Sequence, residues 1–266
     1  MKKNIKSIIR DLIPVRLQVP IKYWYCYFNR MLEPEMDYLE YLIPSGGHVI
    51  DIGGNRGIYT YKFNLLDLKI ETFEPNPDCF TILKSWAHRK KQVTIHSTAL
   101  SNASGLANLY IPIDNLGIEH DASATIESDG FENARNQEVH LEKLDFFKFT
   151  GIDFIKIDVE GHESSLIEGA QETLDINKPV LLIEIEQRHN KENITKIFER
   201  LFNLGYKGFF LKDAQVHDLK IFNINQFQPL DKIGNYGNYI NNFFFLHSER
   251  INNGEYKKFL NLIAQN

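Results

Sequence analysis

VIDIGGNRGIYTY, residues 49–61, begins as a buried strand and then breaks into an acid, two adjacent glycines, an asparagine and an arginine before apolar residues resume. Glycines after a strand let the backbone approach a ligand closely, and the helix that follows presents free N–H groups there. The loop is not the dinucleotide fingerprint G-x-G-x-x-G, which from Gly53 would require glycines where the chain has Asn55 and Ile58. No GK[ST] follows either, which excludes a P-loop. Alone, the loop is compatible with a nucleotide-like ligand or with a tight turn that binds nothing.

Strand and helix patterns alternate around this loop. We expect strands over 48–53, 69–75, 93–100, 106–113, 138–144, 153–159, 179–186, 205–211 and 241–248, and helices over 33–43, 59–66, 77–88, 164–174 and 191–204. Repeated βα units predict an α/β fold with a mostly parallel sheet and helices on both faces. The last two strands are joined without a clear helix, which predicts an antiparallel edge strand at the end.

Composition limits the class of protein. The 266 residues are 43% hydrophobic and 24% charged, as in an ordinary globular protein with one large domain. A net charge of -5 and a pI near 6.0 give no general attraction to nucleic acid. The two cysteines, Cys26 and Cys79, form no CxxC pair, so neither a disulfide framework nor a zinc site is suggested. With no transmembrane run and no signal peptide in the sequence, we expect a cytoplasmic protein.

Residues 1–32 form a basic, aromatic extension ahead of the main domain expected over 33–266. Its charges and rings are Lys2, Lys3, Lys6, Arg10, Arg16, Lys22 and Arg30 against Asp11, with Tyr23, Trp24, Tyr25, Tyr27 and Phe28. One interpretation is a helical extension that packs its rings on the core or on a second subunit, with its lysines solvated. The alternative is peripheral contact with a membrane. Pro14 and Pro20 argue against a single long amphipathic helix.

Acidic residues stand where the first two strands of the main domain end. In sheets of this kind ligands bind at the carboxyl ends of the strands, near the point where strand order reverses. Glu74 follows Gly57 by 17 residues, about where a carboxylate accepts hydrogen bonds from a ribose diol. Asp51 can help hold the amino-acid end of a cationic ligand. Glu74 is also compatible with a turn-capping role at 75–77, but the two strand ends together favour S-adenosylmethionine over NAD.

Four blocks of sequence carry a resemblance to a known family. VIDIGGNRGIYT, FEPNPDCFTIL, FIKIDVEGHESSLIEGA and PVLLIEIE, in this order and at these spacings, resemble the FkbM family of S-adenosylmethionine-dependent methyltransferases over about 33–186. The resemblance implies the class I methyltransferase, Rossmann-like fold, with a seven-stranded sheet and an antiparallel final hairpin. It also implies methyl transfer, mostly to hydroxyl groups of sugars, glycans, or polyketide and related natural products.

The resemblance also implies which residues bind the cofactor. By position these are Asp51, Gly53, Asn55, Gly57, Glu74 and Pro75, with Ala99 and Ser101 from the third strand end near the adenine. Gly54 departs from the family pattern, in which alanine is more usual.

The block FIKIDVEGHE is unusual for a central strand. Lys156, Asp158 and Glu160 alternate on one face, where charges are costly to bury, and Glu184 continues the pattern on the next strand. A structural ion-pair ladder, for example Lys156 with Glu184, is one explanation. Asp158 and Glu160 lie nearer the strand end, with His162 just beyond, and are better placed for chemistry.

A sugar hydroxyl is a poor nucleophile at neutral pH, so methyl transfer to it needs a base or a metal ion. We assign Asp158, Glu160 and His162 to the acceptor side as candidate catalytic residues, with Glu184 supporting them; the pKa of free histidine suits a general base. Asp158, Glu160 and Glu184 could also hold a divalent metal such as magnesium, although no compact motif requires one.

Two loops are candidates for acceptor recognition. The stretch 115–136 is long and polar for a connection in a compact domain, and 228–242 mixes glycine with Tyr236 and Tyr239. Non-functional surface loops have similar composition. The acceptor is expected to be a small molecule or a saccharide.

Two functions from other classes are alternatives. An NAD-dependent sugar oxidoreductase would share the sheet but should carry the glycine fingerprint or a Tyr-x-x-x-Lys motif, and no tyrosine in the sequence has a lysine four residues later. A non-catalytic nucleotide-binding module could keep the fold without methyl transfer.

Overall fold

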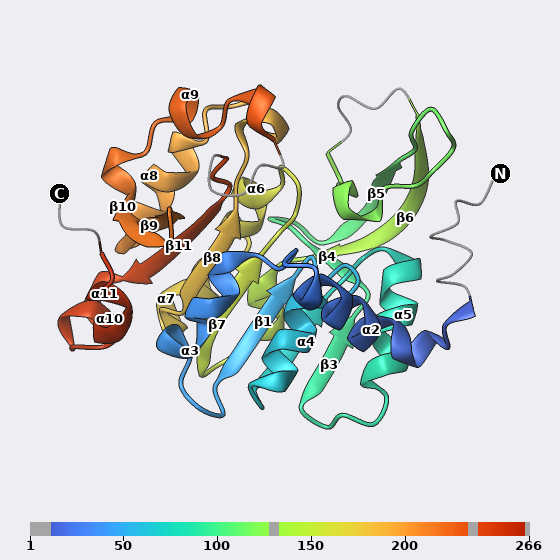
Figure 1. Ribbon diagram of the computed structural model, residues 1–266, viewed down its shortest axis with the longest axis horizontal. Helices are drawn as coiled ribbons and strands as arrows, with labels where there is room; N and C mark the ends of the chain where they lie inside the picture. Colours follow the sequence, from blue (N-terminus) through green and yellow to red (C-terminus); the bar gives the residue numbers. More distant parts are fainter. Residues whose placement is uncertain (1–11, 128–132, 234–238, 264–266) are drawn as a thin grey trace.

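The computed structural model describes residues 12–127, 133–233 and 239–263, and shows a central sheet with helices on both faces and a small second sheet beside it (Figure 1). Within these residues the main sheet has eight strands: β1 (His48–Ile52), β2 (Lys69–Phe73), β3 (Val93–His96), β7 (Ile152–Ile157), β8 (Val180–Glu184), β9 (Tyr206–Lys212), β10 (Gln215–Asp218) and β11 (Asn242–His247). The helices are α2 (Val15–Phe28), α3 (Leu39–Leu42), α4 (Ile58–Leu65), α5 (Pro77–Ala87), α6 (Glu163–Glu168), α7 (Gln171–Asn177), α8 (Thr195–Asn203), α9 (Ile224–Phe227), α10 (Ser248–Asn252) and α11 (Lys257–Leu260).

The strand order is β10-β9-β11-β8-β7-β1-β2-β3. The five strands from β3 to β8 are parallel, and β11 is antiparallel to both β8 and β9. The mostly parallel α/β sheet and the antiparallel final strand are therefore confirmed. The expected number of seven strands is wrong because β10 adds an eighth, antiparallel strand at the edge. The last strand is not an edge strand, since β11 inserts between β8 and β9.

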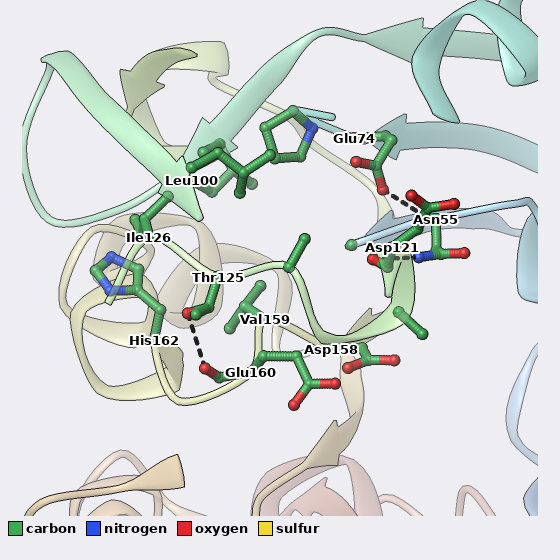
Figure 2. Close-up of a pocket in the computed structure, with 16 residues that line it drawn as sticks. Asn55, Glu74, Leu100, Asp121, Thr125, Ile126, Asp158, Val159, Glu160 and His162 are labelled. Atoms are coloured by element: carbon green, nitrogen blue, oxygen red, sulfur yellow. Dashed lines mark hydrogen bonds between the residues drawn. The ribbon is translucent and has the colours of Figure 1, made fainter. Parts of the chain in front are cut away.

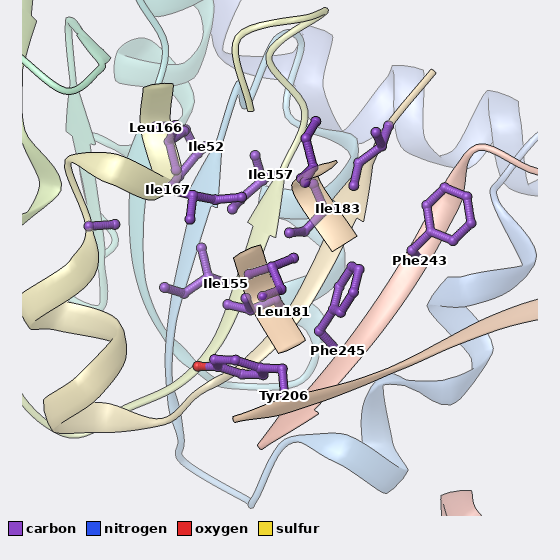
Figure 3. Packing of buried hydrophobic residues seen from close by; sticks show 14 of the residues in the cluster. Ile52, Ile155, Ile157, Leu166, Ile167, Leu181, Ile183, Tyr206, Phe243 and Phe245 are labelled. Atoms are coloured by element: carbon purple, nitrogen blue, oxygen red, sulfur yellow. The ribbon is translucent and has the colours of Figure 1, made fainter. Parts of the chain in front are cut away.

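Both faces of the main sheet are covered by apolar side chains. One cluster joins the sheet to α6, α7 and α8, and Figure 3 shows part of it, including Ile157, Leu181 and Phe243. The other joins the opposite face to α2, α3, α4, α5 and α11 through side chains such as Phe63 and Phe154. Burial on both faces explains why the central strands read as continuous apolar runs. The charged positions at their carboxyl ends are exceptions to that rule and mark the edge of the sheet where the site lies.

A second, three-stranded sheet has the order β4-β6-β5. Its strands are β4 (Thr98–Leu100), β5 (Gly105–Pro112) and β6 (Ala134–Glu142). The expected single strand over 93–100 is therefore two strands, β3 and β4, which pair in different sheets. Between β5 and β6 lies the polar stretch with a short 3₁₀ helix, η2 (Asp121–Ser123).

The helix expected over 164–174 is divided in two. Helix α6 ends at Gly169, where an added Cβ would lie 1.9 Å from the carbonyl oxygen of Ser101. Helix α7 then starts afresh, and the Asp145 carboxylate accepts hydrogen bonds from the backbone N–H groups of Glu172 and Thr173 at 3.1 and 2.8 Å. Close packing against the strand of the second sheet therefore breaks the helical pattern.

The N-terminal extension contains α2, a helix of 14 residues that runs through Pro20. Figure 1 shows it crossing α4 and α5, with which it is in contact. Proline 20 removes one backbone hydrogen bond, and burial of Val19, Tyr23 and Cys26 against the core offsets that loss. Of the five aromatic rings only Tyr23 is buried. None of the described helices has the length and apolar character needed to cross a membrane.

Glu35 gives a prediction for stability. It is buried in the 3₁₀ helix η1 (Pro34–Tyr38), and burial followed by the charge of Glu33 raises its pKa from 4.5 to about 8. Because the pKa is higher in the folded state, the stabilising contribution is complete below about pH 4.5 and is lost as the pH rises towards 8. Glu35→Gln should therefore gain stability relative to wild type as pH rises, by up to about 1.4 kcal/mol per pH unit. Urea unfolding at mildly acidic and mildly alkaline pH measures this, and an equal difference at both would contradict it.

Candidate functional site

Two adjoining pockets open at the carboxyl ends of the central strands. The first has a volume of about 660 Å³, part of it open to solvent, and Figure 2 shows the residues around it. Its walls are formed by Gly53, Asn55, Glu74, Pro75, Ala99, Leu100, Leu109, Asp121, Ala122, Ala124, Thr125, Ile126, Asp158, Val159, Glu160 and His162. One side is therefore apolar, and the other carries the carboxylates that follow β2 and β7, together with that of Asp121 on η2.

The second pocket has a volume of about 670 Å³, also partly open. It is lined by Lys22, Met31, Leu32, Glu33, Met36, Asp51, Gly53, Gly54, Asn55, Arg56, Ile58, Tyr59, Ala122, Lys156 and Asp158. Four of these residues also line the first pocket: Gly53, Asn55, Ala122 and Asp158. Both pockets therefore meet at the loop after β1 and at the end of β7, where the order of the parallel strands reverses.

Glycine is needed in the loop after β1 for conformation and for space. Gly53 has φ 80°, and an added Cβ would lie 1.8 Å from the carbonyl oxygen of Asp158. Gly57 has φ 79°, and its Cβ would meet Leu83 at 2.7 Å. A Cβ at Gly54 would lie 2.3 Å from Cγ2 of Thr72, which explains why alanine does not stand there. The glycines thus let the loop pack tightly between its neighbours.

Glu74 anchors this loop from the end of β2. Its carboxylate accepts hydrogen bonds from the backbone N–H of Asn55 at 2.5 Å and of Asn76 at 2.7 Å. Burial raises the pKa of Glu74 to about 7, although these two N–H groups act in the opposite direction. Glu74 therefore caps the turn, as one interpretation of the sequence expected, and lines the first pocket as well.

Asp51 lines the second pocket and accepts a hydrogen bond from the Thr60 hydroxyl. Burial raises its pKa to about 6, while Thr60 and Lys156 lower it. The Lys156 ammonium lies 3.2 Å from Oδ1 of Asn242, 4.0 Å from Oε2 of Glu184 and 5.2 Å from the centre of the Tyr59 ring. The expected contact between Lys156 and Glu184 is therefore present.

Arg56 ties the polar stretch to the loop after β1. Its guanidinium forms an ion pair with the carboxylate of Asp121, and the Asn55 side-chain amide donates to the Asp121 carbonyl oxygen at 2.9 Å. Farther along, the Thr125 hydroxyl donates to the carbonyl oxygen of Glu160 at 2.9 Å (Figure 2). The segment 121–126 thus forms a wall of the first pocket.

Asp158 and Glu160 have different electrostatic environments. Burial raises the pKa of Asp158 to about 6, and the Lys156 charge limits that rise. Burial, then the charge of Asp158, raises the pKa of Glu160 further, to about 9. The Lys156 charge therefore favours the ionised form of Asp158, whereas the neighbouring acids favour the neutral form of Glu160.

His162 uses both ring nitrogens within the protein. Nδ1 lies 2.7 Å from Oε1 of Glu127, and Nε2 lies 2.9 Å from Oγ of Ser101. The ring thus lines the first pocket while it connects the polar stretch to the end of β4. A group held in this way is better suited to positioning than to accepting a proton from a substrate.

The residues expected from the sequence divide into three groups. Those that line the first pocket are Gly53, Asn55, Glu74, Pro75, Ala99, Asp158, Glu160 and His162. Asp51 lines the second pocket, with Gly53, Asn55 and Asp158 shared. Gly57 and Ser101 line neither; Gly57 packs against Leu83, and Ser101 contacts His162.

Several pocket residues were not identified from the sequence. Lys22, Glu33 and Tyr59 line the second pocket, and Leu100, Leu109 and Ile126 line the first. The late loop behaves differently: Tyr239 donates to Glu186 at 2.6 Å and lines neither pocket, while Tyr236 lies outside the described residues. Among residues 12–127, 133–233 and 239–263, no group of three or more His, Cys, Asp or Glu side chains is arranged to hold a metal ion, including the Asp158, Glu160 and Glu184 set.

The chain matches one family model and is similar to several solved structures. The family model "Methyltransferase FkbM domain" matches residues 51–207. Among solved structures, the chain is similar to methyltransferase FkbM from Methylobacillus flagellatus KT (12% identity, TM-score 0.48, 87% of this chain and 56% of that chain). It is also similar to a SAM dependent methyltransferase from Aquifex aeolicus (12% identity, TM-score 0.43, 92% of this chain and 98% of that chain). A third similar structure is an rRNA methylase from Streptococcus thermophilus (13% identity, TM-score 0.44, 80% of this chain and 93% of that chain). The chain thus spans little more than half of the Methylobacillus protein, and no curated protein matches it.

The parallel strands, the antiparallel strand inserted beside β8 and the glycine loop at the switch point define the class I methyltransferase fold. Because the FkbM domain model matches more than half of the sequence, the chain belongs to the FkbM methyltransferase family.

Proposed function

We propose that the protein is an S-adenosylmethionine-dependent O-methyltransferase that acts on a hydroxyl of a sugar, glycan or polyketide-type natural product. The observation that supports this most strongly is the position of Asp158. It lines both pockets, so a cofactor with its nucleoside in the first pocket and its amino-acid end in the second would carry its sulfur next to this carboxylate.

The residues present fit this cofactor. Ala99, Leu100 and Leu109 supply apolar walls for a flat base, and Glu74 is a carboxylate within reach of a ribose bound in the same pocket. The second pocket contains the acids Glu33 and Asp51, which suit the ammonium group of an amino acid. When bound, the cofactor supplies a methyl group activated on a sulfonium.

The chain's own contribution to the chemistry is a base and a fixed geometry. Asp158, whose ionised form is favoured by the Lys156 charge, would accept the proton of the acceptor hydroxyl. Glu160 in its neutral form can donate a hydrogen bond to the acceptor, and His162 fixes the wall at residues 125–127. Alignment of acceptor and methyl group then provides much of the acceleration.

His162→Gln is expected to lower turnover about tenfold to a hundredfold, since the wall it holds would shift. The affinity for S-adenosylhomocysteine should stay near that of wild type. A positioning role also predicts an unchanged pH profile, measured as labelled methyl transfer from S-adenosylmethionine to the best acceptor in a panel of glycosides. If the fall in activity at acidic pH disappeared in this variant, the result would instead show that His162 is the base.

Isothermal titration calorimetry tests the choice of cofactor. We expect one molecule of S-adenosylhomocysteine per chain and no heat with NAD. Binding of NAD alone would favour the oxidoreductase alternative, whereas S-adenosylhomocysteine binding without transfer to any acceptor in a broad panel would favour a non-catalytic binding module.

A further inference from the structure

We propose that Lys22 of the N-terminal extension binds the carboxylate at the methionine end of the cofactor, an inference that rests on the proposed function. Lys22 lies on α2, outside the region that the family model matches, yet it lines the second pocket with Asp51, Gly53 and Asn55. Burial of Val19 and Tyr23 on the same helix fixes α2 against the core, which holds the lysine at the pocket.

The charges in the second pocket favour Lys22 over the other cations that line it. Lys156 is held by Asn242, Glu184 and the Tyr59 ring, and Arg56 is paired with Asp121. Lys22 has no ion pair within the part of the chain that the structure describes. Burial, and then the charge of Arg56, lowers the pKa of Lys22, and the opposite charge of a bound carboxylate would offset both effects.

The distribution of charge around Lys22 matches a zwitterion. The same pocket carries the carboxylates of Glu33, Asp51 and Asp158, which suit an ammonium and a sulfonium but would repel a carboxylate. A carboxylate therefore needs a cation at the pocket wall, and Lys22 supplies it. The extension thereby becomes part of the cofactor site.

Calorimetry with two ligands tests the role of Lys22. S-Adenosylhomocysteine carries the amino-acid carboxylate, whereas 5′-methylthioadenosine keeps the nucleoside and sulfur but lacks it. Lys22→Met should weaken S-adenosylhomocysteine binding by about 10- to 100-fold and leave 5′-methylthioadenosine within about twofold. Lys22→Arg should retain most of the affinity. Lys69→Met, at an exposed lysine at the amino end of β2, is the control and should behave as wild type.

The outcomes separate the inference from the proposed function. If wild type binds S-adenosylhomocysteine and Lys22→Met binds it equally well, the role of Lys22 is wrong and the proposed function stands. Equal weakening of both ligands would also contradict it, because a general disturbance of the pocket, not a lost carboxylate contact, would explain the result. If wild type binds neither ligand, the proposed function itself fails.

A different observation points to a membrane partner: we infer that the outer side of α2 docks on an anionic membrane surface. Leu17, Ile21, Trp24 and Phe28 follow helical spacing and are exposed by 42%, 44%, 39% and 76%, on the side opposite the buried residues. The Trp24 and Phe28 rings lie 5.9 Å apart. Apolar side chains with tryptophan on one helix face are typical of interfacial helices.

Basic groups beside this face select an anionic partner. A groove between α2 and α5 is lined by Arg16, Phe80, Thr81, Lys84, Ser85 and His88. Neither Arg16 nor Lys84 has an acidic partner among the described residues, and the hydroxyl of Ser85 adds a donor of the kind that phosphate accepts, whereas the Thr81 hydroxyl donates to the carbonyl oxygen of Pro77 at 2.8 Å. The sequence before α2 adds Lys2, Lys3, Lys6 and Arg10, although the chain as a whole has a net charge of -5. Lipid phosphate is the partner that these charges complement.

Vesicle sedimentation with the full-length protein tests this. Wild type should sediment with vesicles that contain phosphatidylglycerol and much less with phosphatidylcholine alone. Trp24→Ser with Phe28→Ser should abolish sedimentation, and Arg16→Gln with Lys84→Gln should remove the preference for the anionic lipid. Phe202→Ser, at an exposed ring on α8, is the matched control and should sediment as wild type.

Equal sedimentation of wild type and the Trp24 and Phe28 variant would overturn the inference. Light scattering without vesicles tests whether a second copy of the chain, instead of a membrane, covers this face of α2. A wild-type dimer that becomes monomeric in this variant, with no vesicle binding by either, would show that the face binds a second copy of the chain. Free phosphate that protects the protein thermally, again without vesicle binding, would assign the groove to a soluble anion.

Discussion

Asp158→Asn is expected to lower methyl transfer by about 100- to 10,000-fold, because the variant cannot accept the proton of the acceptor hydroxyl. Its affinity for S-adenosylhomocysteine should change little, since that ligand has no sulfonium charge for the carboxylate to stabilise. The pH profile gives a second readout. Burial raises the pKa of Asp158 to about 6, so wild-type activity should rise as pH increases through that value. The rise should disappear in Asp158→Asn.

Glu160→Gln is the matched control, because Glu160 lines the same pocket and its pKa is raised well into the alkaline range. A neutral amide mimics the protonated acid, so this variant should keep most of its activity at neutral pH. Initial rates of labelled methyl transfer across pH measure both variants. Full activity in Asp158→Asn, or a larger loss in Glu160→Gln, would show that Asp158 is not the base.

Glu74→Gln is expected to weaken S-adenosylhomocysteine binding by about 30- to 100-fold and to destabilise the apo-protein by about 1–3 kcal/mol. Both oxygens of Glu74 accept backbone N–H groups, from Asn55 and Asn76. In the amide, one of these N–H groups would face an NH₂ group and remain unsatisfied. The loop after β1 would then lose its anchor, and the ribose would lose a charged acceptor.

Glu71→Gln controls for general loss of stability. Glu71 lies on β2, the strand that Glu74 follows, and is also buried. Its Oε2 lies 2.9 Å from Nε2 of His96, but it lines neither of the two pockets. The Glu71→Gln variant should have a lower urea midpoint of unfolding than wild type and an unchanged affinity for S-adenosylhomocysteine. Calorimetry and urea unfolding on both variants make the comparison. Equal ligand affinity in wild type and Glu74→Gln would remove Glu74 from the cofactor site.

The strand ends could be predicted from the sequence because parallel strands bring their carboxyl ends to one edge. Asp51, Glu74 and Asp158 are separated along the chain, yet each follows an apolar run, which is enough to place all three around one cleft. The βα alternation likewise predicted the order of most elements. These features depend on local pattern and on topology rules that hold for the whole fold class.

Contacts between distant segments could not be predicted in this way. Two contacts depend on how the polar stretch folds back over the pocket: the ion pair of Arg56 with Asp121 and the hydrogen bond from Thr125 to Glu160. No hydrophobic periodicity in the sequence indicates the path of that stretch. Lys22 looked like a solvated lysine because the packing of α2 is a tertiary property. Strand β10 is only four residues long, too short to give a clear alternating pattern.

A crystal structure of the protein with S-adenosylhomocysteine tests the central claim most directly. The claim predicts the adenine against Ala99 and Leu100, the ribose hydroxyls at Glu74, and the amino-acid end in the second pocket near Asp51 and Lys22. The sulfur should then face Asp158. A ligand bound elsewhere, or one whose amino-acid end points away from the second pocket, would contradict the account.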